Sequence, residues 1–129
     1  MTELECALNE LHDVCKAITA ALPEGGVVIL KGDLAAGKTT LTQAFARYLG
    51  LDDAVTSPTF SLQQCYGGKL FHYDIYNQGL EHFLSLGMLE ELEREGYHLV
   101  EWGDESLARL LVSAHIPTIT VEIKKTDND

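Results

Sequence analysis

Residues 32–39, which read GDLAAGKT, constrain the fold more than any other part of the chain. They fit the pattern G-x-x-x-x-G-K-[ST] and lie between a short apolar run at 27–31 and a segment of helical periodicity at 38–49. A continuous β-branched run bounded by glycines is typical of a strand buried on both faces, as in parallel sheets. The sequence therefore predicts strand, loop and helix in that order, within a parallel or mixed sheet.

A loop of this pattern binds phosphate groups. Its backbone N–H groups surround the β- and γ-phosphates, and the N-terminus of the following helix adds a partial positive charge. Lys38 is expected to neutralise phosphate oxygens as a catalytic residue, and the Thr39 hydroxyl to ligate Mg²⁺. The alternative is a glycine-rich turn before an ordinary helix. The expected nucleotide-binding residues of this loop are Gly32, Asp33, Leu34, Ala35, Ala36, Gly37, Lys38, Thr39 and Thr40.

The remaining segments predict a single α/β domain over residues 1–129. Apolar residues at steps of three and four predict a helix over 3–21, with a Thr2–Glu5 capping box. Gly67–Gly68 joins two strand-like runs, 59–66 and 69–73, into an antiparallel hairpin. The fold class expected is a P-loop NTPase, with a mixed, mostly parallel central sheet flanked by helices. Its other elements are one helix over 79–95 broken near Gly87, or two consecutive helices there, a strand over 97–101, a helix over 104–111 and a strand over 118–123.

Charge and composition limit the functions of the chain. It has 20 acidic and 9 basic residues, for a formal net charge of −11. Such a surface repels phosphate backbones, so we expect nucleic acid to be bound only through a partner that supplies positive charge. No apolar run approaches the roughly 20 residues that cross a bilayer, and the N-terminal segment lacks the features of a secretory signal. We expect a cytoplasmic protein that does not bind membranes.

Hydrolysis also requires a group that holds the metal and a group that positions water. Residues 97–101 form an apolar run that ends in Glu101, as in a Walker B motif, so Glu101 is expected to reach Mg²⁺ directly or through water. Asp74 ends a second apolar run and is expected to orient the attacking water. Thr59 lies where a switch segment would sense the γ-phosphate. The alternatives are a solvent-facing strand end for Glu101 and a turn residue or helix N-cap for Asp74.

Two aromatic side chains adjoin these candidates. Trp102, the only tryptophan, follows Glu101 directly, and a lone tryptophan is more often a core residue than a functional one. His72 fits a partly buried, hydrogen-bonded histidine, and we assign it no catalytic role.

In order and spacing, five segments together resemble the TsaE (YjeE) family: GDLAAGKTT at 32–40, SPTF at 57–60, HYDIY at 72–76, LG at 86–87 and EW at 101–102. That family is the bacterial ATPase of tRNA threonylcarbamoyladenosine (t6A) biosynthesis. The resemblance implies ATP or ADP and Mg²⁺ as ligands, and weak ATP hydrolysis by the isolated protein. The family's metal and catalytic positions correspond to Thr39, Asp74 and Glu101, with Lys38 on the phosphates, Thr59 in the switch-like segment and Trp102 beside the nucleotide.

The resemblance also implies partners. Family members act with the threonylcarbamoyltransferase subunit and its inactive paralogue, of the TsaD and TsaB types, in a complex that modifies adenosine 37 of tRNA. ATP turnover would reset that complex between rounds. Contact with tRNA would then be indirect, which agrees with the acidic composition of this chain.

The chain departs from the family pattern at two positions. Ala35 stands where Gly is usual, and a positive φ there would cost about 1 kcal/mol and predict a slightly strained loop. Asn77 stands where Arg commonly follows the Asp-x-Tyr motif. If that Arg contacts a partner or phosphate in relatives, this chain must use another group.

Two other functions remain open at the level of sequence. One is a small-molecule or nucleoside kinase, which usually closes an Arg-bearing lid over the phosphates; none of the three arginines lies in a lid-like insertion. The other is a nucleotide-gated interaction module, in which binding without significant turnover is the output. The sequence has no Asn-Lys-x-Asp motif for guanine, which favours ATP.

Overall fold

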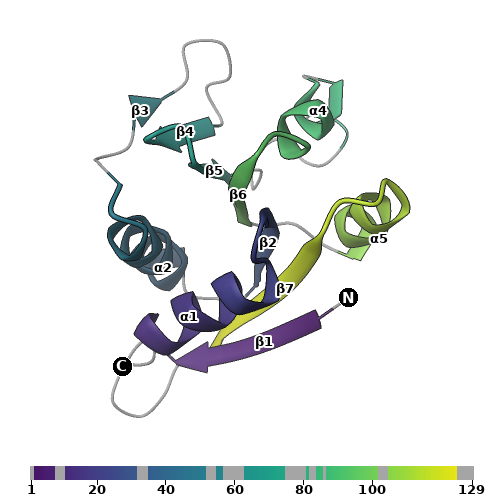
Figure 1. Cartoon of the computed structure of the whole chain (residues 1–129). Coiled ribbons are helices and arrows are strands. Elements are labelled where there is room, and N and C mark those ends of the chain that lie inside the picture. The colour runs from purple at the N-terminus through teal and green to yellow at the C-terminus, as the bar shows by residue number, and fades with distance from the viewer. Residues whose placement is uncertain are drawn as a thin grey trace.

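The computed structural model describes residues 2–7, 11–31, 35–51, 55–56, 63–74, 81, 84–85, 87–101 and 105–124. Within them, a seven-stranded sheet has the order β1-β7-β2-β6-β5-β4-β3 (Figure 1). The strands are β1 (Thr2–Ala7), β2 (Gly25–Lys31), β3 (Val55–Thr56), β4 (Gln63–Tyr66), β5 (Leu70–Asp74), β6 (Gly96–Glu101) and β7 (Thr118–Lys124). The helices are α1 (Leu11–Ala21), α2 (Ala35–Tyr48), α4 (Met88–Leu92) and α5 (Glu105–Ser113).

The sheet is mixed and mostly parallel, which confirms the predicted fold class. Neighbouring strands from β1 to β5 in the sheet order are parallel, whereas β4 pairs antiparallel with both β5 and β3. The predicted hairpin is the β4–β5 pair. Its turn has φ of 59° at Gly67 and 71° at Gly68, and the Lys69 N–H donates to the Tyr66 carbonyl. Positive φ at both central residues defines the tight turn that suits the twist of a hairpin, and glycine adopts it readily.

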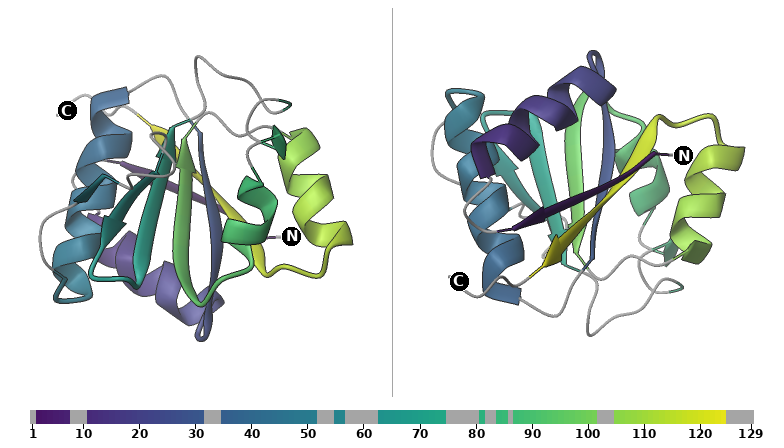
Figure 2. Two further views of the ribbon diagram at one scale, coloured as in Figure 1. Left: turned by 90° about the horizontal axis from the view of Figure 1, so that it is seen from above. Right: turned by 90° about the horizontal axis from the view of Figure 1, so that it is seen from below.

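Helices cover both faces of the sheet (Figure 2). The core between the sheet and α1 and α2 contains Ile18, Phe45 and, from β2, Val28 and Leu30. The core on the α4 and α5 face contains Val27 and Ile29 of the same strand. These four β2 side chains are 0% exposed, so β2 is buried on both faces as its continuous apolar sequence predicts.

The N-terminal segment differs from its prediction. Residues 2–7 form β1, which pairs in parallel with β7, and the helix begins only at Leu11. The predicted helix over 3–21 is therefore wrong for residues 3–7, and so is the Thr2–Glu5 capping box, whereas residues 8–10 lie outside the described residues. Leu4 and Cys6 alternate with glutamates as a strand would, but Leu4 also fits a helical step to Leu8. A run this short satisfies both periods, and pairing with β7 decides between them.

Most other elements match their predicted ranges. The strands β2, β5, β6 and β7 and the helix α5 lie within two residues of the predicted bounds. The interruption near Gly87 is present, since Gly87 has φ of 77° and precedes α4, but this helix ends at Leu92 and not at the predicted residue 95. The short strand β3 was not predicted, and residues 59–62 of the predicted hairpin strand lie outside the described residues. None of the helices in the described ranges is long and apolar enough to span a bilayer.

The helix after the glycine-rich loop begins earlier than predicted. The α2 helix starts at Ala35, three residues before the predicted start at Lys38. Because a helical backbone has negative φ, the strain considered for Ala35 does not arise at that position.

Candidate functional site

Two of the expected site residues, Asp74 and Glu101, end neighbouring strands at the carboxyl edge of the sheet. The parallel strands β2, β6 and β5 are neighbours, and in their register Glu101 of β6 lies opposite Leu30 of β2 and Asp74 of β5. Adjacent strands are about 4.8 Å apart, so the backbones that carry the two carboxylates are in direct contact. The α2 helix begins four residues after β2 ends, at Ala35. The topology thus brings a helix N-terminus and two strand-end acids to one edge, where open α/β sheets bind ligands.

The structure describes these residues to different extents. Of the expected phosphate-binding residues, 35–40 lie in α2 and the Thr40 side chain is exposed. For Lys38 and Thr39 the structure gives the helical backbone, and their roles remain predictions. For Asp74 it likewise gives the backbone, at the end of β5. The expected residues outside the described ranges are Gly32, Asp33, Leu34, Thr59, Trp102 and the departure Asn77.

Glu101 is a buried carboxylate. It is 4% exposed, so the alternative of a solvent-facing strand end is wrong. The His72 ring nitrogen Nε2 contacts Glu101 Oε2, and within the described part of the chain it is the one hydrogen-bond partner of this carboxylate. Among the described residues, the other oxygen, Oε1, has no hydrogen-bond partner, so its lone pairs are available to a ligand. A buried acid of this kind is costly unless it is paired or binds a metal.

The donor set fits Mg²⁺. This ion prefers oxygen ligands and is usually held by one or two carboxylates together with substrate phosphates and water, rather than by a dedicated protein cage. Accordingly, no group of three or more His, Cys, Asp or Glu side chains that could hold a metal occurs among the described residues. Glu101 is the described side chain that would hold the ion, with Thr39 as the second expected ligand.

His72 is the site residue that sequence reasoning missed. It is buried as expected, at 8% exposure, but its contact with Glu101 was not foreseen. In the β5–β6 register His72 lies opposite Leu99, two residues before Glu101, so the two side chains are diagonal neighbours on one face. The signal in the sequence is the spacing of His72 and Asp74, which places both positions on the same side of one strand.

On the opposite face of the sheet, a chain of hydrogen bonds ties the same strands to α4. Gln63 Nε2 donates to the Tyr73 hydroxyl at 3.0 Å and to Glu91 Oε1 at 3.1 Å. The His98 Nε2–H donates to the Arg94 carbonyl at 2.8 Å, since a carbonyl only accepts. His98 Nδ1 then accepts from the Tyr73 hydroxyl at 2.9 Å. Arg94 completes the network, because its guanidinium donates to Glu91 Oε1 at 3.0 Å.

Burial sets the protonation states of His98 and Tyr73 in this hydrogen-bond network. It lowers the pKa of His98 and raises the pKa of Tyr73, so both groups stay neutral near pH 7. A neutral His98 ring is also what the hydrogen bonds require, because Nδ1 must accept. The strands that end in Asp74 and Glu101 are thus linked side chain to side chain by a network with no net charge at its centre.

Lowering the pH is expected to destabilise the fold through His98. Its pKa in the unfolded chain is about 6.5 and is lower in the folded protein, so the unfolded state binds the proton first. The contribution of neutral His98 to the free energy of unfolding is fully present above pH 6.5. It falls as the pH drops toward the folded-state pKa, by at most about 1.4 kcal/mol per pH unit for this group. Urea unfolding at pH values from 7.5 to 5.5 measures the slope.

The matched comparison is between two histidine variants. His98→Gln should lose part of the acid slope, whereas His12→Gln, which alters an exposed histidine of α1, should keep it. Equal slopes in the two variants would contradict the role of His98.

Comparison with known proteins agrees with the sequence motifs. The family model described as "Threonylcarbamoyl adenosine biosynthesis protein TsaE" matches residues 6–129. The protein named tRNA threonylcarbamoyladenosine biosynthesis protein TsaE from Treponema pallidum is 35% identical over 126 residues, which cover 93% of this chain and 89% of the relative. The protein of the same name from Bacillus subtilis is 34% identical over 126 residues, covering 94% of this chain and 75% of the relative. Because the family model matches most of the chain and the fold is that of a P-loop protein, the chain belongs to the TsaE family.

Proposed function

We propose that the chain is a Mg²⁺-dependent ATPase that acts in the biosynthesis of threonylcarbamoyladenosine in tRNA. The observation that carries the ATPase proposal is the buried Glu101 carboxylate. It lies at the carboxyl end of β6, between the strand that leads into the glycine-rich loop and the strand that ends in Asp74. The family to which the chain belongs, and the names of its relatives, support the place in tRNA modification.

The roles of the residues follow from this arrangement. Backbone amides of residues 32–40 and the start of α2 bind the phosphates, and Lys38 neutralises their charge. Thr39 and Glu101 hold Mg²⁺, which when bound supplies positive charge to the β- and γ-phosphate oxygens. Asp74, at the register position opposite Glu101, orients the attacking water. Thr59 senses the γ-phosphate, and Trp102 lies beside the nucleotide.

The proposed partners are the threonylcarbamoyltransferase subunit and its inactive paralogue, of the TsaD and TsaB types. The net charge of −11 leaves this chain poorly suited to hold tRNA itself. Contact with tRNA therefore falls to the partner subunits, and ATP turnover by this chain resets the complex between rounds of modification. Weak hydrolysis by the isolated chain and faster hydrolysis in the complex follow from this division of labour.

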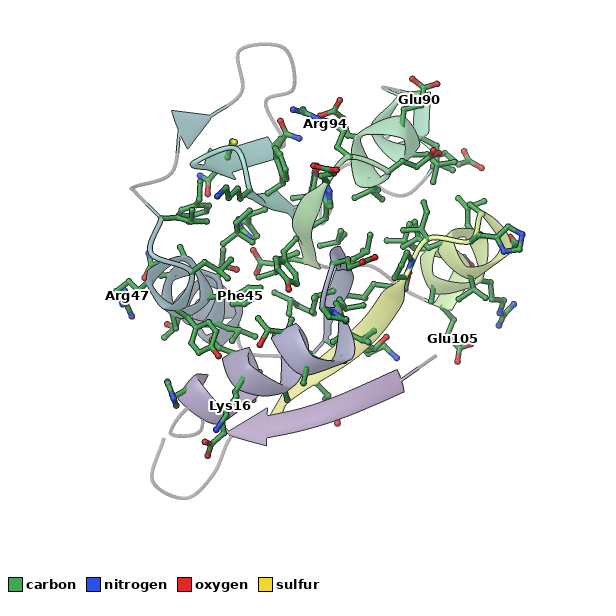
Figure 3. All side chains as sticks on the ribbon, in the orientation of Figure 1. Lys16, Phe45, Arg47, Glu90, Arg94 and Glu105 are labelled. Atoms are coloured by element: carbon green, nitrogen blue, oxygen red, sulfur yellow. The ribbon has the colours of Figure 1, made fainter. Side chains whose placement is uncertain are left out.

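Replacing Glu101 with Gln tests the proposal. The change keeps the size of the side chain but removes the charge that binds Mg²⁺, so turnover by the complex should fall about 100-fold or more. Phosphate release is measured with the purified chain alone and with both partner subunits added. Glu105→Gln is the matched control, because Glu105 is a surface residue of α5 with a 73% exposed side chain (Figure 3), and it should turn over normally.

The same assay separates the other functions. A kinase would release ADP only when an acceptor such as a nucleoside is supplied. A nucleotide-gated interaction module would bind ATP, yet its turnover would not rise with the partner subunits. Unchanged turnover in Glu101→Gln would exclude the assigned role of that carboxylate.

A further inference from the structure

The contact between His72 and Glu101 joins two neighbouring strands at the proposed metal site. Both side chains are buried, at 8% and 4% exposure, on the face of the sheet that α2 covers. His72 projects from β5 and Glu101 from the end of β6, and their contact runs diagonally across the pair. The pairing depends on the parallel register, so it is a property of the assembled sheet.

The chemistry of the two groups makes the contact directional. An ionised carboxylate only accepts hydrogen bonds, so His72 Nε2–H is the donor and Glu101 Oε2 the acceptor. One oxygen is engaged and the other, Oε1, has no partner among the described residues. A carboxylate fixed by one oxygen cannot turn freely about its terminal torsion, and it presents the second oxygen in a constant direction.

A side chain of the next strand supports the ring from its other side. His72 Nδ1 lies 3.4 Å from the amide oxygen position of Gln64 on β4. An imidazolium ring paired with the Glu101 carboxylate would donate from Nδ1–H to this amide oxygen as well as from Nε2–H to the carboxylate. The ring is thus held between β4 and β6 while it remains part of β5.

We propose that His72 is a positioning residue for the metal site: it holds Glu101 Oε2 so that Oε1 is directed to the Mg²⁺ of the bound nucleotide. This inference rests on the proposed function and adds to it a residue that contacts neither nucleotide nor metal. Partners of this kind, hydrogen-bonded to a metal ligand, typically change metal affinity by about 10- to 100-fold when they are removed.

Three variants of His72 test the proposal in the full chain. His72→Gln keeps an N–H donor at a reach similar to Nε2, His72→Asn keeps a donor that is too short to reach Glu101, and His72→Leu has none. The measurement is the affinity for ADP by calorimetry, with Mg²⁺ and again with EDTA. In His72→Leu and His72→Asn, the gain in affinity that Mg²⁺ gives should fall by about 10-fold or more, while affinity in EDTA stays unchanged. His72→Gln should recover most of the gain.

The outcomes distinguish positioning from a purely structural role. An equal loss of affinity with and without Mg²⁺ would overturn the proposal, as would a Mg²⁺ effect in His72→Asn equal to that of the unaltered protein. So would a His72→Gln variant as impaired as His72→Asn. If His72→Leu fails to fold, the Gln and Asn variants decide between the same outcomes. If the unaltered protein itself binds no ADP in Mg²⁺, the proposed function fails, which is a different result.

Discussion

Replacing Lys38 with Ala is expected to abolish ATP hydrolysis and to weaken nucleotide binding. Residues 32–39 fit the phosphate-binding pattern, and they follow β2, which ends at Lys31, and include the start of α2 at Ala35. The lysine of this pattern is the one side chain of the loop that brings a full positive charge to the β- and γ-phosphates. Removing it should lower turnover by about 100-fold or more, the effect typical of losing a group that stabilises transition-state charge.

A second lysine gives the control for this variant. Lys69 is exposed in the β4–β5 turn, at the end of β5 opposite to Asp74 and so about 17 Å away along the strand. Phosphate release and calorimetry with ATP and Mg²⁺ should therefore show no change for Lys69→Ala. Normal turnover in Lys38→Ala would remove the basis for the nucleotide site.

The parts of the fold that could be predicted are those with local signals. The continuous apolar run of β2 indicates a strand buried on both faces, and it is buried on both. The Gly67–Gly68 pair indicates a tight turn, because glycine readily adopts the positive φ that the turn requires. The local signal of β1 is ambiguous, because the alternation of Leu4 and Cys6 with glutamates fits a strand while Leu4 also fits a helical step to Leu8. Pairing with β7, in which Thr2 lies opposite Ile119, decides for the strand. A pairing between residues so far apart in sequence cannot be detected in an 11-residue window.

The candidate site divides in the same way. Glu101 and Asp74 could be chosen because each ends an apolar run, and the register does place their backbones opposite each other. The contact of His72 with Glu101 could not be predicted, since it depends on β5 lying beside β6 and on which residues face each other. Strand order is set by the packing of the whole sheet, and single-sequence patterns do not carry it.

At their amino ends, the same strands approach each other closely through backbone atoms. Gly96, at the start of β6, has φ of 117°, and a Cβ there would lie 2.4 Å from the Lys69 carbonyl oxygen. That oxygen also accepts the Tyr97 N–H at 2.8 Å, so it cannot move away without losing a hydrogen bond. Gly25, at the start of β2, approaches the Gly96 carbonyl in the same manner, with a Cβ placed 2.4 Å from its oxygen. The three strands that end at the proposed site therefore begin where backbones approach closely, and a side chain does not fit at Gly25 or Gly96.

Gly96→Ala is accordingly expected to destabilise the protein by about 2–5 kcal/mol, the sum of a disfavoured φ and a steric overlap with backbone. The free energy of urea unfolding measures the loss. Gly68→Ala is the matched control, because Gly68 has φ of 71° but nothing within 4 Å of its Cβ position, so it should lose only about 1–2 kcal/mol from the backbone conformation. Equal losses in the two variants would show that the backbone moves to accept the Cβ at Gly96 without a steric cost. A larger loss for Gly96→Ala would show that the fold requires the close approach of β5 and β6 at the start of these strands.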